Sequence, residues 1–163
     1  MDQNIWEYDD FIFKGDELKG MTAKGKDKVK TGGQTDLVIP AVTPDGLPLK
    51  KIADNAFYRR GLTSVVIPDT VESIGYDAFG VCKLKEVKLP EALVNIEGFA
   101  FYRNKLTKVE FGSKVKRIEP SAFAMNELSE IALPETLEYI GASAFYKNAF
   151  ETITFPKALT KID

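Results

Sequence analysis

A 22-residue period constrains this 163-residue chain more than any other feature of its sequence. Five copies cover residues 52–161, and Ile162 begins a sixth. A phenylalanine that always follows an alanine recurs once per copy, at Phe57, Phe79, Phe101, Phe123 and Phe145. An isoleucine stands five residues before each of them, at Ile52, Ile74, Ile96, Ile118 and Ile140. A fixed period of this length is typical of a solenoid, in which each copy forms one coil.

Each copy also predicts one short β-strand. In the segment 62–67, Val65 and Ile67 point to one face, while Ser64 and Val66 point to the other. A proline follows in four of the five copies and ends the strand, because proline has no N–H to donate. No copy can bury its apolar residues alone, so we expect the coils to stack with parallel strands about 4.8 Å apart. The sequence therefore predicts a mainly β solenoid with short helical turns and one strand per coil.

One position of the repeat is filled by Arg60, Cys82, Asn104, Asn126 and Asn148. Asparagine at this place can hydrogen-bond the backbone of adjacent coils, and cysteine is small enough to fit the same slot. A nucleophilic cysteine would need a base and an electropositive site, and the chain has no histidine. We therefore expect a structural role for Cys82.

Residues 1–51 do not follow the period and are predicted to form an N-terminal cap with an irregular first coil, leaving 52–163 as the repeat domain. An aromatic-rich strand over residues 5–13 is expected to form a hairpin with residues 18–21. A polar turn or short helix follows at 22–30. The strand of the first coil comes next and carries a six-residue insertion after it.

The sequence stops where a further Ala-Phe pair would be expected, just after Ile162 begins a new copy. This predicts an excised fragment, or an end that a partner or further repeats cover. Left open, the end would expose an apolar face and favour self-association.

Composition argues against most catalytic and nucleic-acid-binding sites. The absence of histidine excludes Ser-His-Asp and Cys-His triads, and a single cysteine excludes an internal disulfide and a cysteine-rich zinc site. With 22 basic and 24 acidic residues the net charge is −2, which is unfavourable for a nucleic-acid partner. No apolar run approaches the roughly 20 residues of a membrane span, and no signal peptide is visible. We expect no enzymatic activity, no cofactor and no metal.

Two local patterns of the cap region have simple explanations. Residues 20–26 match the start of a phosphate-binding P-loop, but Asp27 replaces the hydroxyl residue that would bind magnesium, so a Lys-rich capping loop is the better interpretation. Residues 14–31 carry six lysines against three acidic residues, a net of +3. This excess could attract an anionic wall or host polysaccharide, but a solvated surface element with balancing charges is the better interpretation.

The outward positions of the predicted strands are the best candidates for binding. They vary between copies while the inward positions stay constant, which is how a repeat array presents a ligand surface on a fixed scaffold. These strand-face residues are Ser64, Val66, Glu86, Lys88, Lys108, Glu110, Glu130, Thr152 and Thr154. Their glutamates, like the aligned Glu97 and Glu119, are paired carboxylates of the kind that glycosidases use, but the interspersed lysines favour a charge-balanced sheet.

A second candidate row places a tyrosine beside a cation on alternate coils. The pairs are Tyr58 with Arg59, Tyr102 with Arg103, and Tyr146 with Lys147. Tyrosine and arginine are favoured at protein interfaces, although packing of the rings against neighbouring side chains explains the row equally well.

Residues 74–90 begin Ile-Gly-Tyr-Asp-Ala-Phe and resemble the BspA-type (Treponema-pallidum-type) leucine-rich repeat, whose pattern is I-G-x-x-A-F-x-x-C/N-x-L-x-x-I-x-I-P. All five copies match, with Glu97 and Glu119 in place of a glycine and Gly112 in place of the proline. Members of this family are commonly bacterial surface proteins used in adhesion and virulence. The resemblance implies a non-enzymatic, extracellular cell-surface module whose strand face binds a host protein or an extracellular glycan. A structural spacer that binds nothing, or an intracellular scaffold for protein partners, remains the alternative.

Overall fold

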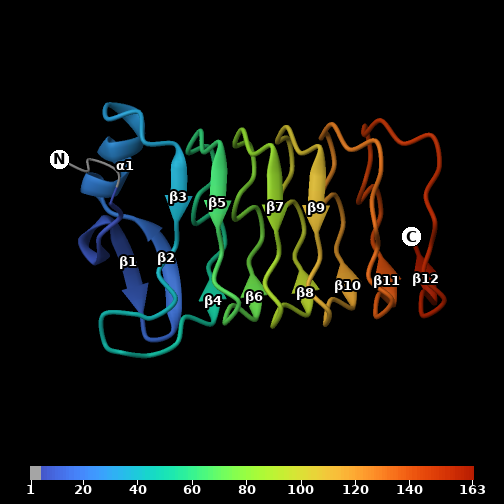
Figure 1. Ribbon diagram of the computed structural model, residues 1–163, viewed down its shortest axis with the longest axis horizontal. Coiled ribbons are helices and arrows are strands. Elements are labelled where there is room, and N and C mark those ends of the chain that lie inside the picture. The colour runs from blue at the N-terminus through green and yellow to red at the C-terminus, as the bar shows by residue number, and fades with distance from the viewer. Residues whose placement is uncertain (1–4) are drawn as a thin grey trace.

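The stacking predicted from the repeat is present in the computed structural model, which describes residues 5–163 (Figure 1). Each copy forms one coil, and the coils follow one another from a cap at the N-terminal end to the C-terminal end. Equivalent residues lie side by side in successive coils, 22 residues apart, as in the pairing of Ile74 with Ile96. The predicted solenoid of parallel strands is confirmed.

Two ladders of short strands run along the solenoid. The first has three residues per strand and comprises β3 (Asp36–Val38), β5 (Ser64–Val66), β7 (Glu86–Lys88) and β9 (Lys108–Glu110). The second has two residues per strand and comprises β4 (Lys51–Ile52), β6 (Ser73–Ile74), β8 (Asn95–Ile96), β10 (Arg117–Ile118), β11 (Tyr139–Ile140) and β12 (Lys161–Ile162). The sequence predicted the first ladder and not the second, because two residues carry no alternation from which a strand could be inferred.

The first ladder is less regular than predicted. β3 pairs with β5 and β7 pairs with β9, but the equivalent segments around Glu130 and Thr152 are extended chain without strand pairing. Strands expected in those two coils are therefore absent from the structure, although the outward residues there are exposed as predicted.

The cap consists of a short 3-10 helix η1 (Tyr8–Asp10), the strands β1 (Phe11–Lys14) and β2 (Glu17–Met21), and helix α1 (Ala23–Lys30). β1 and β2 form the predicted antiparallel hairpin, and β2 pairs in parallel with β4, so the cap extends the second ladder into an eight-stranded sheet. The strand predicted over residues 5–13 begins only at Phe11, because η1 precedes it. Residues 1–4 of the predicted cap lie outside the described part of the chain.

Helix α1 is held on the cap by capping and ion pairing. The hydroxyl of Thr22 accepts the N–H of Gly25, and a side chain at Gly25 would clash with the Asp10 carbonyl at 2.2 Å. The fully buried carboxylate of Asp10 pairs with Lys28, while Lys24 bonds Asp9 at 2.8 Å. Within residues 5–163, no helix is long and apolar enough to cross a membrane.

Stacked phenylalanine rings form the centre of the core. The ring centroids of Phe57 and Phe79 lie 5.1 Å apart with an interplanar angle of 13°, and Phe79 and Phe101 lie 5.4 Å apart at 7°. The stack continues through Phe123 to Phe145, whose ring centroids lie 5.7 Å apart. Offset or stacked aromatic pairs add roughly 0.5–1.5 kcal/mol each beyond burial, so every coil is stabilised by both neighbours.

The recurring polar position forms an asparagine ladder beside the phenylalanine stack. The side chain N–H₂ of Asn126 donates to the carbonyls of Phe101 (2.9 Å) and Phe123 (3.0 Å), and its oxygen accepts the N–H of Leu106 at 3.0 Å. Asn104 makes the same three bonds one coil earlier. Each asparagine thereby satisfies backbone groups of two coils that water cannot reach.

Cys82 occupies the same slot, as predicted. Its thiol donates to the Phe57 carbonyl at 3.3 Å, and burial raises the pKa of the thiol above its usual value. This is the environment of a structural cysteine rather than a nucleophile. The thiol offers the N–H of Leu62 only a weak sulfur acceptor in place of the asparagine oxygen.

We expect Cys82→Asn to stabilise the protein by about 1–2 kcal/mol, because the amide would bond the carbonyls of Phe57 and Phe79 and accept the N–H of Leu62. Urea unfolding followed by circular dichroism measures the shift. Cys82→Ala is the control, since it removes the thiol without supplying the amide. Equal midpoints for the two variants would show that the asparagine ladder does not hold the coils together.

Candidate functional site

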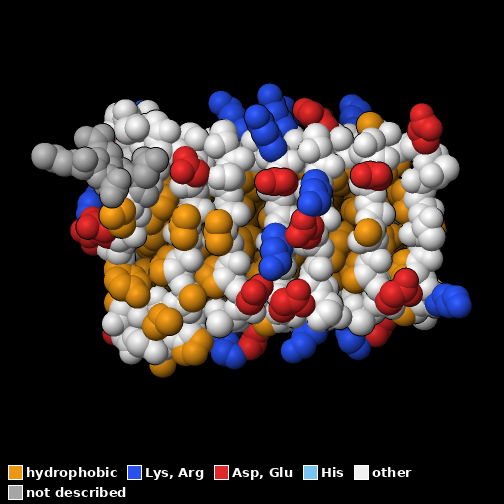
Figure 2. All heavy atoms as spheres, in the orientation of Figure 1, with side chains coloured by type: hydrophobic (Ala, Val, Ile, Leu, Met, Phe, Trp, Pro, Cys, Tyr) orange, Lys and Arg blue, Asp and Glu red, His pale blue; other side chains and the backbone are white. Residues whose placement is uncertain are grey.

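The strand-face residues predicted from the sequence lie on one exposed face of the solenoid (Figure 2). In β5, β7 and β9 the middle residue is buried and the two flanking residues are exposed. The face changes character along its length. Val38 and Val66 are exposed and paired at the cap end, whereas charged side chains cover β7 and β9 in Figure 2.

Opposite charges face each other across β7 and β9. Glu86 pairs in register with Lys108, and Lys88 pairs with Glu110. Lys108 also donates a hydrogen bond to Glu110, and this bond, with the lysine charge, holds the pKa of the Glu110 carboxyl below its usual value. Each glutamate of these two strands therefore lies opposite a lysine rather than another glutamate, and opposite charges across a strand pair are stabilising.

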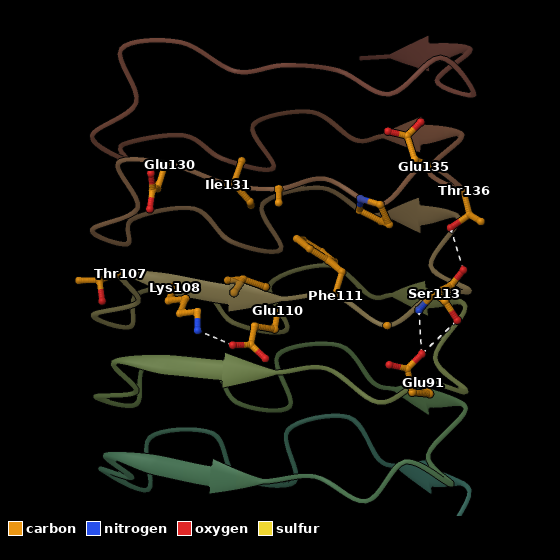
Figure 3. Close-up of a pocket in the computed structure, with 14 residues that line it drawn as sticks. Glu91, Thr107, Lys108, Glu110, Phe111, Ser113, Glu130, Ile131, Glu135 and Thr136 are labelled. Atoms are coloured by element: carbon orange, nitrogen blue, oxygen red, sulfur yellow. Dashed lines mark hydrogen bonds and ion pairs between the residues drawn. The ribbon is translucent and has the colours of Figure 1, made fainter.

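A groove interrupts this face on the far side of β9. Its volume is about 890 Å³, and it lies between residues 107–113 and residues 130–136 (Figure 3). Among the described residues, β9 has no ladder partner in the coil that follows it. Gly112 just after β9 packs closely on the preceding coil, because a Cβ there would lie 2.3 Å from the Pro90 carbonyl.

The groove combines an apolar floor with an acidic rim. Phe111 and Ile131 are half-buried and lie between the two coils in Figure 3, where the core is reachable from solvent. Four glutamates line the rim, namely Glu91, Glu110, Glu130 and Glu135. Glu91 accepts both the N–H and the hydroxyl of Ser113 at 3.0 Å, and these bonds lower the pKa of its carboxyl.

Sequence reasoning found only part of this groove. Lys108, Glu110 and Glu130 were predicted as strand-face residues, and the structure brings them together. Phe111 and Ile131 were assigned to the constant inward positions, so their partial exposure was missed. The single signal in the sequence was Gly112, which replaces the proline that ends the other strands.

The tyrosine row lies on the turns between the two ladders, apart from the strand face. The Arg59 guanidinium lies 5.3 Å from the centre of the Tyr58 ring, and the Lys147 ammonium lies 5.5 Å from that of Tyr146. The ring of Tyr102 instead packs against the ring of Phe99, with the ring centres 5.1 Å apart. The neighbouring Arg103 is exposed. The structure therefore joins tyrosine to cation in two of the three pairs.

The aligned carboxylates Glu97 and Glu119 lie close enough to repel. Burial raises the pKa of the Glu97 carboxyl, and the charges of Glu119 and, to a smaller extent, Asp54 raise it further, while Arg117 opposes them. Arg117 itself bonds Glu119 at 2.8 Å. These two residues stand where the repeat otherwise has a small residue, so the repulsion is specific to these two coils.

We expect Glu97→Gln to be more stable than the wild type at pH 7, by at most about 1 kcal/mol because the site is half-exposed and screened. A carboxyl pKa raised by folding destabilises the charged form, so the wild type recovers stability as the pH falls through that pKa. The difference should vanish below the ordinary value of 4.5. Urea midpoints between pH 3 and pH 8 measure it, with the exposed Glu127→Gln as control; a constant difference over this range would contradict the repulsion.

Comparisons with known proteins agree on the architecture. The model of the BspA type leucine-rich repeat region matches residues 50–163 in six copies. The leucine-rich repeat protein of Treponema pallidum has a similar fold, with a TM-score of 0.70 and 22% identity over 94% of this chain and 78% of that one. None of the curated proteins matches the sequence.

Two further solved structures are similar over most of this chain. The pneumococcal vaccine antigen PcpA has a TM-score of 0.54 and 25% identity over 93% of this chain. A leucine-rich cell surface protein of Faecalibacterium prausnitzii has a TM-score of 0.40 and 25% identity over 93% of this chain. The match spans 37% of the former protein and 52% of the latter.

Proposed function

Because the chain belongs to the BspA-type leucine-rich repeat family, we propose that it is a non-enzymatic adhesion module of a bacterial cell surface. Its strand face would bind a host protein or an extracellular glycan. The family and the fold support a protein-interaction module. A surface location accords with the pneumococcal relative, which is a vaccine antigen.

The groove beside β9 carries this proposal. It is a hollow of the strand face that is lined by apolar side chains, and buried apolar contact supplies most of the affinity at protein interfaces. Phe111 and Ile131 provide that contact, and the surrounding glutamates and Lys108 provide polar contacts at the rim. The charged pairs of β7 and β9 continue the surface towards the cap.

Affinity would be distributed over several coils, because the exposed residues of neighbouring strands form one continuous surface. We expect single alanine substitutions at Lys88, Lys108 or Thr152 to weaken binding by less than about five-fold each, since rim contacts contribute little individually. Titration calorimetry with the bound ligand measures each change. Complete loss of binding by one folded variant would contradict distributed contacts.

The decisive variant exchanges the charges of the strand face. This variant combines Glu86→Lys, Lys88→Glu, Lys108→Glu and Glu110→Lys. It keeps the net charge, and it keeps opposite charges across the ladder, so folding should be preserved. A ligand would meet the reversed pattern. Binding to immobilised matrix proteins, mucins and wall polysaccharides at physiological salt should weaken at least ten-fold for each saturable ligand.

The matched control exchanges two charges elsewhere, by Lys14→Glu and Asp45→Lys, both exposed and outside the face. It should bind as the wild type does. Unchanged binding by the strand-face variant would favour a structural spacer or a different binding surface. Recovery of native protein only from cytosol would favour the intracellular scaffold.

A further inference from the structure

A second hollow lies where the cap meets the first repeats, and basic side chains line it. Its volume is about 340 Å³. Three segments contribute the cations, namely α1, the turn after β4 and the turn after β6. The five are Lys26, Lys30, Arg59, Arg60 and Lys83. Val29, Thr35 and Gly61 complete the lining, which contains no carboxylate. We call this hollow the basic cleft.

Within the described residues the cations of the basic cleft have few partners: Arg59 lies over the Tyr58 ring, 5.3 Å from its centre, and its charge opposes the burial that raises the pKa of the Asp77 carboxyl. None of the five takes part in an ion pair there, whereas the neighbouring Lys24 and Lys28 of α1 are both paired with carboxylates of the cap. The structure therefore divides the Lys-rich segment 14–31 into lysines that hold the cap together and lysines left free at the cleft. Five unpaired cations around one hollow repel each other, so an anion placed between them would be stabilised.

Arg60 gives the cleft its most specific feature. It stands at the repeat position where Cys82 and the asparagines bond the backbone of the preceding coil. At Arg60 the cap replaces that coil, and the Nε of its guanidinium is buried without a hydrogen-bond partner. A buried donor without an acceptor is costly, and here it belongs to a side chain that lines a cationic hollow.

We propose that the basic cleft binds the sulfate or phosphate groups of an anionic polysaccharide. The guanidinium groups of Arg59 and Arg60 present forked donors that match tetrahedral oxyanions, and Lys26, Lys30 and Lys83 supply point charges around them. The site lies at the cap and shares no residue with the strand face, so it adds a second ligand to the proposed function and stands independently of it.

Titration calorimetry of the folded protein at low and physiological salt tests the proposal. The probes are a sulfated oligosaccharide, its desulfated counterpart and a glycerol phosphate oligomer of equal length. Saturable binding is expected for probes that carry sulfate or phosphate and not for the desulfated one. The relative affinity of the sulfated and phosphorylated probes identifies which polymer the cleft prefers.

Lys30→Gln combined with Lys83→Gln should weaken this binding by about ten-fold, since two exposed charge contacts are lost. The melting temperature of this double variant should be unchanged or higher than that of the wild type, because two like charges are removed from the cleft. The control, Lys14→Gln with Lys157→Gln, loses the same charge outside the cleft and should bind normally. Arg60→Lys, which keeps the charge and loses the fork, should also bind more weakly.

Three results would overturn the proposal. Equal weakening by the cleft variant and its control would mean attraction to net charge alone. Equal binding of the desulfated probe would mean that the oxyanions are not recognised. Loss of binding in the charge-exchanged strand-face variant would place the anion on the strand face. Normal anion binding by that variant, even if its adhesion is lost, would separate the two sites.

Discussion

Every repeat coil depends on backbone hydrogen bonds to its neighbours, and these bonds recur along the repeat domain with the 22-residue period. The turns carry buried carbonyl and N–H groups that water cannot reach, and Asn104, Asn126 and Asn148 bond them from inside the core. A change in the length of one coil would misplace these partners. The phenylalanine stack and the alignment of the outward strand residues both follow from this constraint, because equal coils place equal positions in register.

Features repeated along the sequence were predictable, and features made by a single departure were not. The recurring Phe, Ile and Asn positions predicted the solenoid, its core and the slot of Cys82, because each position was visible five times. The groove exposes Phe111 and Ile131 at positions that are buried or less exposed in earlier coils, and Gly112 lines it where the other copies have a proline. The basic cleft depends on how α1 docks, because Lys30 and Lys83 come from segments far apart in the sequence. Such contacts leave no periodic signal.

The groove beside β9 and the basic cleft have opposite chemistry on one frame of stacked coils. The groove beside β9 is apolar and rimmed by glutamates, while the basic cleft is polar and cationic. Stacked coils hold them at a fixed separation, since each coil is bonded to the next. Two weak sites on one rigid body act together when a ligand or surface offers both kinds of group, and the gain in affinity then depends on spacing rather than on new contacts.

The in-register pairing of Ile74, Ile96 and Ile118 means that each of these strands presents the same edge to the next. A whole coil can therefore be duplicated, deleted or shuffled in a gene without leaving an unmatched backbone group, whereas a shift of a few codons cannot. Reordering whole coils would rearrange the outward residues of the strand face while leaving the inward contacts between coils unchanged.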